Sequence, residues 1–406
     1  MTPEIKQRIT QLNNGEVPVG YKKTDFGIFP CDWVTDKKLK DLGSFGKGKG
    51  LPGDKMTTEG VPCVGYGDIY MKYNHFHFEK AQTFVDEETA AESQPIHKGT
   101  LLFTGTGETA DEIGKCVCYN GDETIYAGGD IITFASDKVN PLFLSYQQYQ
   151  DFSLRKKASF GQGHSVVHIQ RENLEKLNVA YPKSTEEQSK IAEILMKWDE
   201  VIELQEQYIN ILEARKRYLM EELLLPQKDW EVASLGQLVS KEKGKAVKIS
   251  ENGKIPILDM DYIETGLFSN YTDDDGILAS KEDILVLWDG ANAGTLLTNV
   301  EGIVGSTFAL LKIKSRQILP LYLHYWLTIQ NQKNSALREG SGIPHMPKDY
   351  LKMQKVCYPD ISKQTKISKT LALSEVEILL NNKKLKIFVE QRKTLQQYLL
   401  NGIVRV

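Results

Sequence analysis

The most regular hydrophobic pattern in this chain occurs twice, once near the middle and once at the end. In each copy, apolar residues follow spacings of four and three over ten positions, as on a helix that packs against a partner along its length. The first copy is Ile191, Leu195, Trp198, Ile202, Gln205, Ile209, Leu212, Lys216, Leu219 and Leu223. The second is Ile367, Leu371, Ser374, Ile378, Asn381, Leu385, Phe388, Arg392, Leu395 and Leu399. We therefore predict two long helices, with polar residues at matching places.

The ends and charges of these segments suggest how they pack. Ser184 or Thr185 can open a capping box with Glu187 or Gln188. Residues 186–225 carry a net charge of −5 and residues 361–400 a net charge of +5, so the two helices attract each other. We predict an antiparallel coiled coil of roughly 60 Å, from about 1.5 Å per residue. The alternative is that each helix folds onto its own domain.

The heptads also limit the register of an antiparallel pair. If partner residue numbers sum to 590, all ten core positions face each other, and Trp198 faces Arg392 as a cation over an indole ring. A sum of 597 matches polar with polar residues but leaves two core positions unpaired. We favour 590, because a peripheral polar group can reach water at less cost than apolar burial is worth.

The remaining sequence reads as two globular parts of one repeat. Short strands separated by glycine-rich turns are expected at residues 100–103, 131–134, 284–287 and 308–311. Trp33, preceded by Pro30, corresponds to Trp230, preceded by Pro226. The later anchors recur as well: residues 141–146 correspond to 320–325, and Tyr-Pro precedes Gln-x-x-Ile at both 181–191 and 358–367. We predict an α+β protein with two mixed α/β domains in a pseudo-two-fold repeat, 1–183 and 226–360, joined by long helices at 184–225 and 361–406.

Composition excludes several classes of protein. The chain has 406 residues, a net charge of −4 and a pI near 6.1, so no global charge indicates a polyanion partner. It has no long apolar run and its N-terminus does not resemble a signal peptide, so we expect a cytoplasmic protein. Five cysteines without a C-x-x-C pair argue against a disulfide framework or zinc site and favour buried free thiols. Residues 43–50 approach a nucleotide-binding loop, but glycine stands where a hydroxyl residue is needed.

Two variable units, each opened by a P-x-D-W-like segment with an L-G element and closed by an E-Q-x-x-I helix, resemble the DNA specificity subunit of type I restriction-modification enzymes. The segments 99–115, 283–294 and 340–345 fit the style of that family. The resemblance covers the whole chain and implies a non-catalytic subunit. Each unit would be a target-recognition domain that reads one half of a split, asymmetric DNA site.

The same resemblance implies partners. The helices would set the spacing of the half-sites and dock two methyltransferase subunits, which would carry S-adenosylmethionine, and restriction or translocase subunits would be further partners. No cofactor or metal is expected in this chain. Two alternatives stay open: a specificity subunit of a bifunctional, type IIB-like restriction system, and a coiled-coil scaffold with two protein-binding heads.

Residues for DNA contact are chosen by chemistry. Lysines beside glycine that recur in both units suit phosphate contact, and polar or aromatic side chains on loops suit base reading. In the first unit the candidates are Lys47, Lys49, Tyr66, Tyr70, Lys72, Tyr73, Arg155, Lys156, Lys157, Gln162 and His164. In the second they are Lys243, Lys245, Lys248, Tyr262, Asn270, Tyr271, Arg338, Ser341, His345 and Lys348.

Enzyme functions find little support in the sequence. An adenine methyltransferase would need a Pro-Pro motif, which does not occur. A nuclease would need clustered carboxylates and a lysine, and Asp111-Glu112-x-x-Lys115 is the nearest approach. Since the chain outside the two helices carries a net charge of −4, we expect the isolated chain to bind DNA weakly and without sequence preference.

Overall fold

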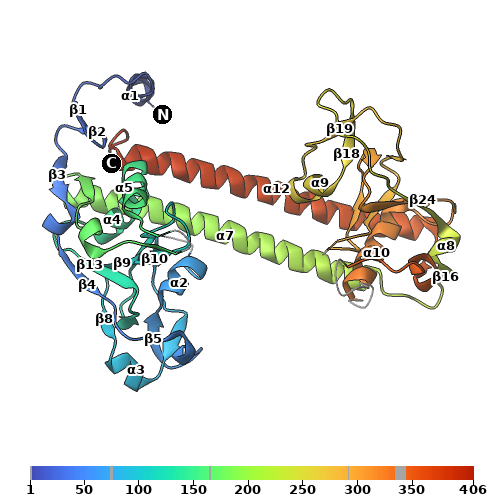
Figure 1. Ribbon diagram of the computed structural model, residues 1–406, viewed down its shortest axis with the longest axis horizontal. Coiled ribbons are helices and arrows are strands. Elements are labelled where there is room, and N and C mark those ends of the chain that lie inside the picture. Colours follow the sequence, from blue (N-terminus) through green and yellow to red (C-terminus); the bar gives the residue numbers. More distant parts are fainter. Residues whose placement is uncertain (1, 74–75, 164–165, 291, 334–343) are drawn as a thin grey trace. The chain divides into compact units, whose positions relative to one another are not determined.

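The computed structural model describes residues 2–73, 76–163, 166–290, 292–333 and 344–406. The chain forms two compact units, Met1–Gln205 with Lys384–Val406 and Glu206–Lys383. Two long helices, α7 (Thr185–Leu223) and α12 (Ile361–Leu400), each contribute residues to both units (Figure 1). This division differs from the four segments proposed from the sequence, because each half of a long helix packs into a different core.

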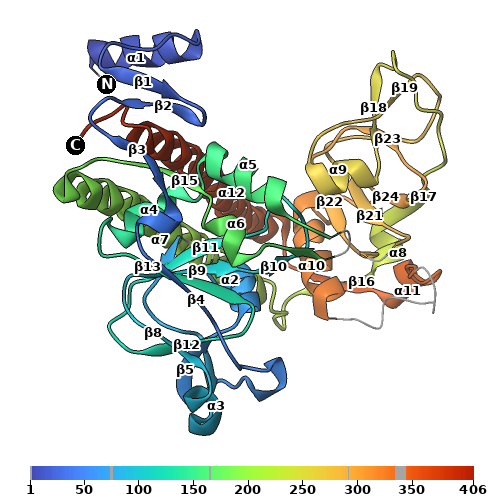
Figure 2. The same cartoon turned by 60° about the vertical axis from the view of Figure 1, so that its left-hand side comes forward.

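The first unit is built on two sheets. A five-stranded sheet has the order β4 (Ser44–Lys47), β13 (Ile131–Ala135), β9 (Thr100–Thr104), β11 (Cys116–Tyr119) and β6 (His77–Phe78), and only β6 runs parallel to its neighbour. A four-stranded sheet has the order β7 (Thr83–Val85), β5 (Val61–Val64), β12 (Ile125–Ala127) and β8 (Gln94–Ile96). Three strand pairs complete the unit: β1 (Tyr21–Thr24) with β2 (Gly27–Pro30), β3 (Val34–Lys38) with β15 (Asn178–Tyr181), and β10 (Thr106–Gly107) with β14 (Val167–His168). Its short helices are α1 (Pro3–Asn13), α2 (Tyr66–Met71), α3 (Glu87–Ala91), α4 (Pro141–Gln147), α5 (Asp151–Phe160) and α6 (Arg171–Leu174) (Figure 2).

The second unit repeats this plan with fewer strands. Its first sheet has the order β17 (Val239–Lys243), β24 (Phe308–Ile313), β21 (Ile284–Leu287) and β22 (Leu296–Thr298). Its second sheet has the order β19 (Tyr271–Thr272), β18 (Ile255–Leu258), β23 (Gly302–Val304) and β20 (Leu278–Ala279), and β16 (Glu231–Ser234) pairs with β25 (Lys355–Tyr358). The short helices are α8 (Leu235–Leu238), α9 (Met260–Thr265), α10 (Pro320–Lys333) and α11 (Tyr350–Met353). All four strands expected from the sequence are confirmed as β9, β13, β21 and β24.

The glutamine explains why a Q-x-x-I motif recurs at the start of both long helices, preceded by Glu187 in the first and by Lys363 in the second. Gln188 accepts a hydrogen bond from the Asn140 backbone (2.7 Å) and donates one to the Pro182 carbonyl (2.8 Å). Gln364 makes the same two bonds in the second unit, with the backbone of residue 319 and the carbonyl of residue 359, both at 2.8 Å. Both side chains are almost fully buried. Each long helix therefore begins at a fixed point on its globular part. Ser184 caps α7, because its hydroxyl accepts from the Glu187 amide (3.2 Å).

The heptad positions face the interior of both units. Ile191, Leu195 and Leu399 lie in the first core, and Ile367 and Leu371 in the second. Of the other heptad residues named as apolar, Ile202, Ile209 and Leu212 are buried, and Trp198, Leu219, Leu223, Ile378, Leu385, Phe388 and Leu395 are half-buried.

Ion pairs between the helices fix the register within each unit. Asp199 and Arg392 pair in the first unit (2.8 Å) and Lys216 and Glu375 in the second (2.6 Å), so partner numbers sum to 591 in both. This follows the favoured alignment to within one residue. The expected contact of Arg392 with the Trp198 indole is wrong, because Arg392 reaches the carboxylate of Asp199 instead, and Trp198 packs edge-on against Phe388.

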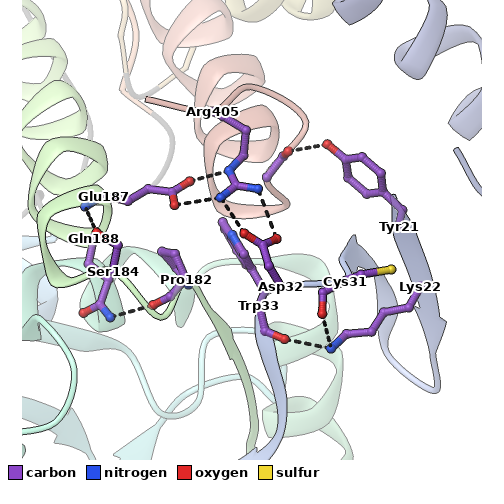
Figure 3. A network of polar contacts seen from close by, with 11 residues as sticks. Tyr21, Lys22, Cys31, Asp32, Trp33, Pro182, Ser184, Glu187, Gln188 and Arg405 are labelled. Atoms are coloured by element: carbon purple, nitrogen blue, oxygen red, sulfur yellow. Dashed lines mark hydrogen bonds and ion pairs between the residues drawn. The ribbon is translucent and has the colours of Figure 1, made fainter. Parts of the chain in front are cut away.

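The two ends of the chain meet in the first unit (Figure 3). Arg405 donates two hydrogen bonds to Glu187 and two to Asp32, at 2.5 to 3.2 Å, and these bonds raise the pKa of Arg405. The Tyr21 hydroxyl donates to the Gly402 carbonyl (2.5 Å), while Trp33 is buried against the same turn. Gly402 has φ +66°, and a Cβ there would lie 2.4 Å from the Pro30 ring. Pro30, Asp32 and Trp33 thus serve to hold the C-terminal turn.

Three smaller findings concern the cysteines, metal sites and membrane spans. Cys63, Cys116 and Cys118 are buried, as expected, but Cys31 is exposed and Cys357 half-buried, so the prediction of buried thiols is wrong for these two. Within the described ranges, no three His, Cys, Asp or Glu side chains gather in a way that could hold a metal ion. No helix in the described part of the chain has the length and apolar character needed to cross a membrane.

Candidate nucleic-acid interface

The lysine-glycine-lysine segments of the two units occupy the same place in the fold. Lys47 ends β4 and Lys243 ends β17, and the glycine that follows donates its amide to the next strand in both cases, Gly48 to Ile131 (2.8 Å) and Gly244 to Phe308 (2.9 Å). A Cβ on either glycine would lie about 2 Å from a backbone carbonyl, at 1.8 Å for Gly48 and 2.1 Å for Gly244. Glycine is therefore required for close approach of two chain segments. Residues 43–50 form a strand and a tight crossing, which explains why the segment only resembles a nucleotide-binding loop.

A histidine also occupies an equivalent place in the two units. Thr106 pairs with His168 through β10 and β14, and Asp289 pairs with His345 through an isolated bridge. The backbone hydrogen bonds beside the two histidines are equivalent as well. The Ile169 amide donates to the Gly105 carbonyl (3.0 Å), and the Met346 amide donates to the Trp288 carbonyl (2.9 Å). The two histidines are thus equivalent in the repeat, and both are exposed.

The chemistry at this equivalent position differs between the units. In the first, the Thr106 hydroxyl lies 3.2 Å from Nδ1 of His168, so the pair is uncharged when the imidazole is neutral. In the second, Asp289 accepts from Lys243 (2.5 Å) and pairs with Nδ1 of His345 (2.7 Å). Burial works against the Asp289 carboxylate, but the hydrogen bonds from Lys243 and His345 outweigh it and lower its pKa. One backbone frame therefore presents a neutral hydrogen-bonding pair in one unit and an ionic cluster in the other.

The ionic cluster continues onto an aromatic ring. The Lys241 ammonium lies 4.0 Å from the centre of the Trp288 ring, a distance typical of a cation–π contact. Burial, with the nearby charge of Lys243, lowers the pKa of Lys241. Sequence reasoning missed Lys241, Asp289, Thr106 and His168. The sequence offered one sign of this site, a histidine between two apolar residues at both 167–169 and 344–346. The two histidines are recognised as equivalent only after their strand and bridge partners are known.

Two predicted contacts in the first unit are corrected by their burial. The side chain of Lys157 is 1% exposed and donates to the Gly114 carbonyl (2.8 Å), and burial lowers its pKa to about 8. Tyr73 is 4% exposed and stacks on Phe78, with ring centres 4.0 Å apart. A buried side chain that already has its partners supports the fold, so neither residue is available at the surface.

The other first-unit candidates are placed at or near the surface. Lys47, Lys49, Tyr66, Lys72, Arg155, Lys156 and Gln162 are exposed. Lys72 already pairs with Asp68 (2.9 Å), while the half-buried Tyr70 hydroxyl bonds to Thr104 (2.8 Å). Gln162 forms a bridge to His168, which brings it to the position described above. His164 lies outside the described residues.

In the second unit the candidates are more scattered. Lys245, Lys248, Tyr271, His345 and Lys348 are exposed, and Lys243, Tyr262 and Asn270 are half-buried. Tyr262 stacks on Phe268 at 4.5 Å, and Asn270 donates to Asp259 (2.7 Å). Asp289 brings the side chains of Lys243 and His345 together, and Asp259 accepts from the Asn270 side chain and from the Tyr262 backbone. Arg338 and Ser341 lie outside the described residues.

Comparison with known proteins agrees with this repeat. A family model for the type I restriction modification DNA specificity domain matches twice, at residues 30–214 and 227–391. The MjaVIII type I restriction enzyme specificity subunit of Methanocaldococcus jannaschii is 32% identical over 186 residues, which is 44% of this chain and 44% of that relative. The putative MjaX specificity subunit of the same organism is 22% identical over 95% of this chain and 97% of its own length.

Solved structures share the fold. The S subunit of a type I restriction-modification system from M. genitalium superposes with a TM-score of 0.59 at 17% identity, over 90% of this chain and 96% of that one. A chain from a structural study of complex assembly in the type I system gives the same score at 13% identity, over 96% and 100%. With two copies of the family domain spanning most of its length, this chain belongs to the type I restriction-modification DNA specificity family.

Proposed function

We propose that this chain is the non-catalytic, sequence-reading subunit of a type I restriction-modification complex and works in the cytoplasm. Each unit reads one half of a split DNA site. The observation that carries the proposal is the repeat itself: Thr106 with His168 and Asp289 with His345 share a backbone position but differ in charge. The two units share a backbone arrangement but present different hydrogen-bonding side chains. This suits two different half-sites, because bases are read by their pattern of hydrogen-bond donors and acceptors.

The lysines supply the part of binding that does not depend on sequence. Lys47, Lys49 and Lys245 are exposed beside their fixed glycines, where they can reach phosphates while the neighbouring pair meets base edges. The remaining exposed candidates would extend the contact along the duplex. Partner subunits would add the rest of the affinity, since the whole chain carries a net charge of −4.

The long helices are proposed to set the distance between half-sites. Helix α7 has 39 residues, hence about 58 Å, which exceeds the roughly 34 to 36 Å that separates two sites one DNA turn apart. Inserting seven residues into each helix at equivalent points keeps the heptads in phase and adds about 10 Å. The preferred spacer should then lengthen by about 3 base pairs. A folded complex with an unchanged spacer would show that the helices do not set the distance.

The same helices offer a second apolar row for partner subunits. Leu204 and Ile211 on α7 are 56% and 63% exposed, and their repeat equivalents on α12, Leu380 and Ile387, are 58% and 52% exposed. Apolar residues seven apart suit docking of a further helix. We propose that each row docks one methyltransferase subunit, which holds S-adenosylmethionine, with restriction or translocase subunits joining outside them.

Introducing a negative charge into either apolar row tests the docking proposal. Leu204→Glu should weaken capture of the methyltransferase on α7, and Leu380→Glu should weaken capture on α12, so each single variant should retain one subunit. Lys383→Glu on α12 is the control for added negative charge. Loss of both subunits from one single variant would contradict two separate rows.

The reading proposal is tested by exchanging residues 31–183 for the corresponding part of a related specificity subunit. Sequencing of modified adenines in the host genome then reports both half-sites. One half should change and the other should stay. If both halves changed together, or if neither changed, the units would not act as separate readers.

A further inference from the structure

The two units differ at one place beside the long helices, which is buried in the first unit and partly exposed in the second. In the first unit, Tyr146 donates to Asp199 (2.7 Å), which also pairs with Arg392 (2.8 Å). In the second, Tyr325 donates to Glu375 (2.8 Å), which pairs with Lys216 (2.6 Å). These are repeat-equivalent triads of tyrosine, carboxylate and cation, one in each unit.

In the first unit, Phe76 covers its triad. The Arg392 guanidinium lies 3.9 Å from the Phe76 ring centre, and the Tyr146 and Tyr149 rings lie 5.1 and 4.5 Å away. The Ser145 hydroxyl donates to the Phe76 carbonyl. Phe76 is thus held by its ring and by its backbone.

In the second unit, a cavity of about 250 Å³ lies at the corresponding place. It is lined by residues that include Lys216, His324, Tyr325, Thr328, Leu296 and Glu375. Thr328 stands where the first unit has Tyr149, and His324 stands where it has Ser145. Within the described residues, the buried Nδ1 of His324 has no hydrogen-bond partner. The cavity is large enough for one aromatic ring, since a cavity of about 150 Å³ accepts benzene.

The strand that carries Phe76 is also missing from the second unit. Strand β6 pairs with the outer edge of β11, and the Cys118 amide donates to the Phe76 carbonyl (2.9 Å). The counterpart of β11 is β22, which is the last strand of its sheet in the described part of the unit (Figure 2). Thr298 corresponds to Cys118. Its amide faces away from β21. The Leu287 amide donates to the Thr295 carbonyl (2.8 Å), and because bonding alternates along an antiparallel pair, residue 298, opposite Ile284, directs its amide to the outer side.

Chain length explains the difference. Eleven residues separate α2 from β7 and include β6, whereas only five separate α9 from β19. Five residues connect the helix to the other sheet but leave none to pair along β22. Within the residues that the structure describes, the second unit therefore combines an open sheet edge, a cavity for one ring and a buried nitrogen without a partner.

We propose that the outer edge of β22 and the adjoining cavity form a docking site for an extended segment of a second polypeptide. This segment pairs with β22 as β6 pairs with β11 and places an aromatic side chain over Lys216 and Tyr325, where Phe76 lies in the first unit. Its backbone carbonyl accepts from the Thr298 amide, and a neighbouring polar group pairs with Nδ1 of His324. Addition of a strand to a free edge provides affinity, and the aromatic pocket provides specificity.

The first unit supplies the probe. A fluorescent peptide with the sequence of residues 72–82 should bind the full-length chain saturably in an anisotropy assay, and the same peptide with Phe76→Ala should bind about tenfold more weakly or worse. Absence of saturable binding up to the solubility limit of the peptide would overturn the proposal.

Two variants of the chain test the two parts of the site. Thr298→Pro removes the outward amide without touching the bonds to β21, and Thr328→Trp fills the cavity. Each should weaken peptide binding about tenfold or more, whereas Leu267→Trp, on an exposed loop of the same unit, should not. Circular dichroism shows that each variant is folded. Unchanged binding by both site variants would place the peptide elsewhere and overturn the proposal.

Two further arms separate other occupants. In the first, the binding of N-acetyl-phenylalanine amide is compared between wild type and Thr298→Pro. Equal binding to both would mean that the cavity is a small-molecule site and that strand pairing plays no part. Self-association of the wild type that is lost in Thr298→Pro would assign the edge to a second copy of this chain. In the assembled complex, a photo-crosslinking residue at position 328 should link to a different polypeptide, and a link only within the chain would contradict docking in trans.

Discussion

Replacing Arg392 with methionine tests how burial sets the strength of the ion pairs between the long helices. Arg392 is 6% exposed and Asp199 4% exposed, and two hydrogen bonds join them. Methionine keeps most of the side-chain volume but removes the charge. Asp199 would then lose its cationic partner in the core and keep the hydrogen bond from the Tyr146 hydroxyl.

The expected cost follows from that uncompensated charge. Removing one partner of a buried pair costs about 3 to 5 kcal/mol. Adding Asp199→Asn should recover most of the loss, to within about 1 to 2 kcal/mol of wild type, since a neutral amide still accepts from Tyr146. The chain offers its own control at the equivalent position: Lys216 and Glu375 have side chains 26% and 40% exposed, so Lys216→Met should cost about 0 to 1 kcal/mol.

Urea unfolding followed by fluorine NMR of 5-fluorotryptophan can assign the loss to one unit. Of the five tryptophans, Trp33 and Trp198 lie in the first unit and the other three in the second. Arg392→Met should lower the urea midpoint of the first two signals only. If Arg392→Met and Lys216→Met cost the same within about 1 kcal/mol, or if the double variant were as unstable as the single one, the reasoning from burial would be refuted.

Three further predictions concern single residues. In the assembled complex, Lys47→Ala should reduce the salt dependence of DNA binding by about 0.9 in log–log slope, while Lys157→Met should leave it unchanged; equal effects would contradict the burial argument. Burial lowers the pKa of His324 to about 4, so the unfolded state binds more protons than the folded state below about pH 6.5. The free energy of unfolding should therefore fall from pH 6.5 toward pH 4, by up to about 3 kcal/mol. His324→Leu should abolish this part of the pH dependence of the urea midpoint. Gly48→Ala should cost at least about 1 to 3 kcal/mol because its Cβ would meet the Gly128 carbonyl, whereas Gly53→Ala, with nothing within 4 Å, should leave the urea midpoint near wild type.

Periodic patterns along the chain were enough to find the long helices, the repeat and the family. Four-three spacing of apolar residues needs no knowledge of the partner, because it reports which face of a helix is buried. The opposite charges of the two segments then indicated that the helices pair, and the pseudo-two-fold repeat indicated an antiparallel arrangement. The Q-x-x-I motif could be found as a repeat. The two hydrogen bonds of Gln188, to Asn140 and to Pro182, could not be inferred, because the Asn140 backbone is distant in sequence.

Only the tertiary structure decided what each polar side chain touches. Lys157 reads as a surface lysine in a basic run, yet its helix turns it onto the Gly114 carbonyl. The equivalence of His168 and His345 depends on strand pairing between segments far apart in the chain. The cavity beside Lys216 exists because a connection is too short to cover β22, and no local pattern records a missing strand. The sequence by itself determined the elements and their repetition, because helix periodicity and motif spacing are local properties. Burial, partners and cavities required the fold, because they depend on which distant segments meet.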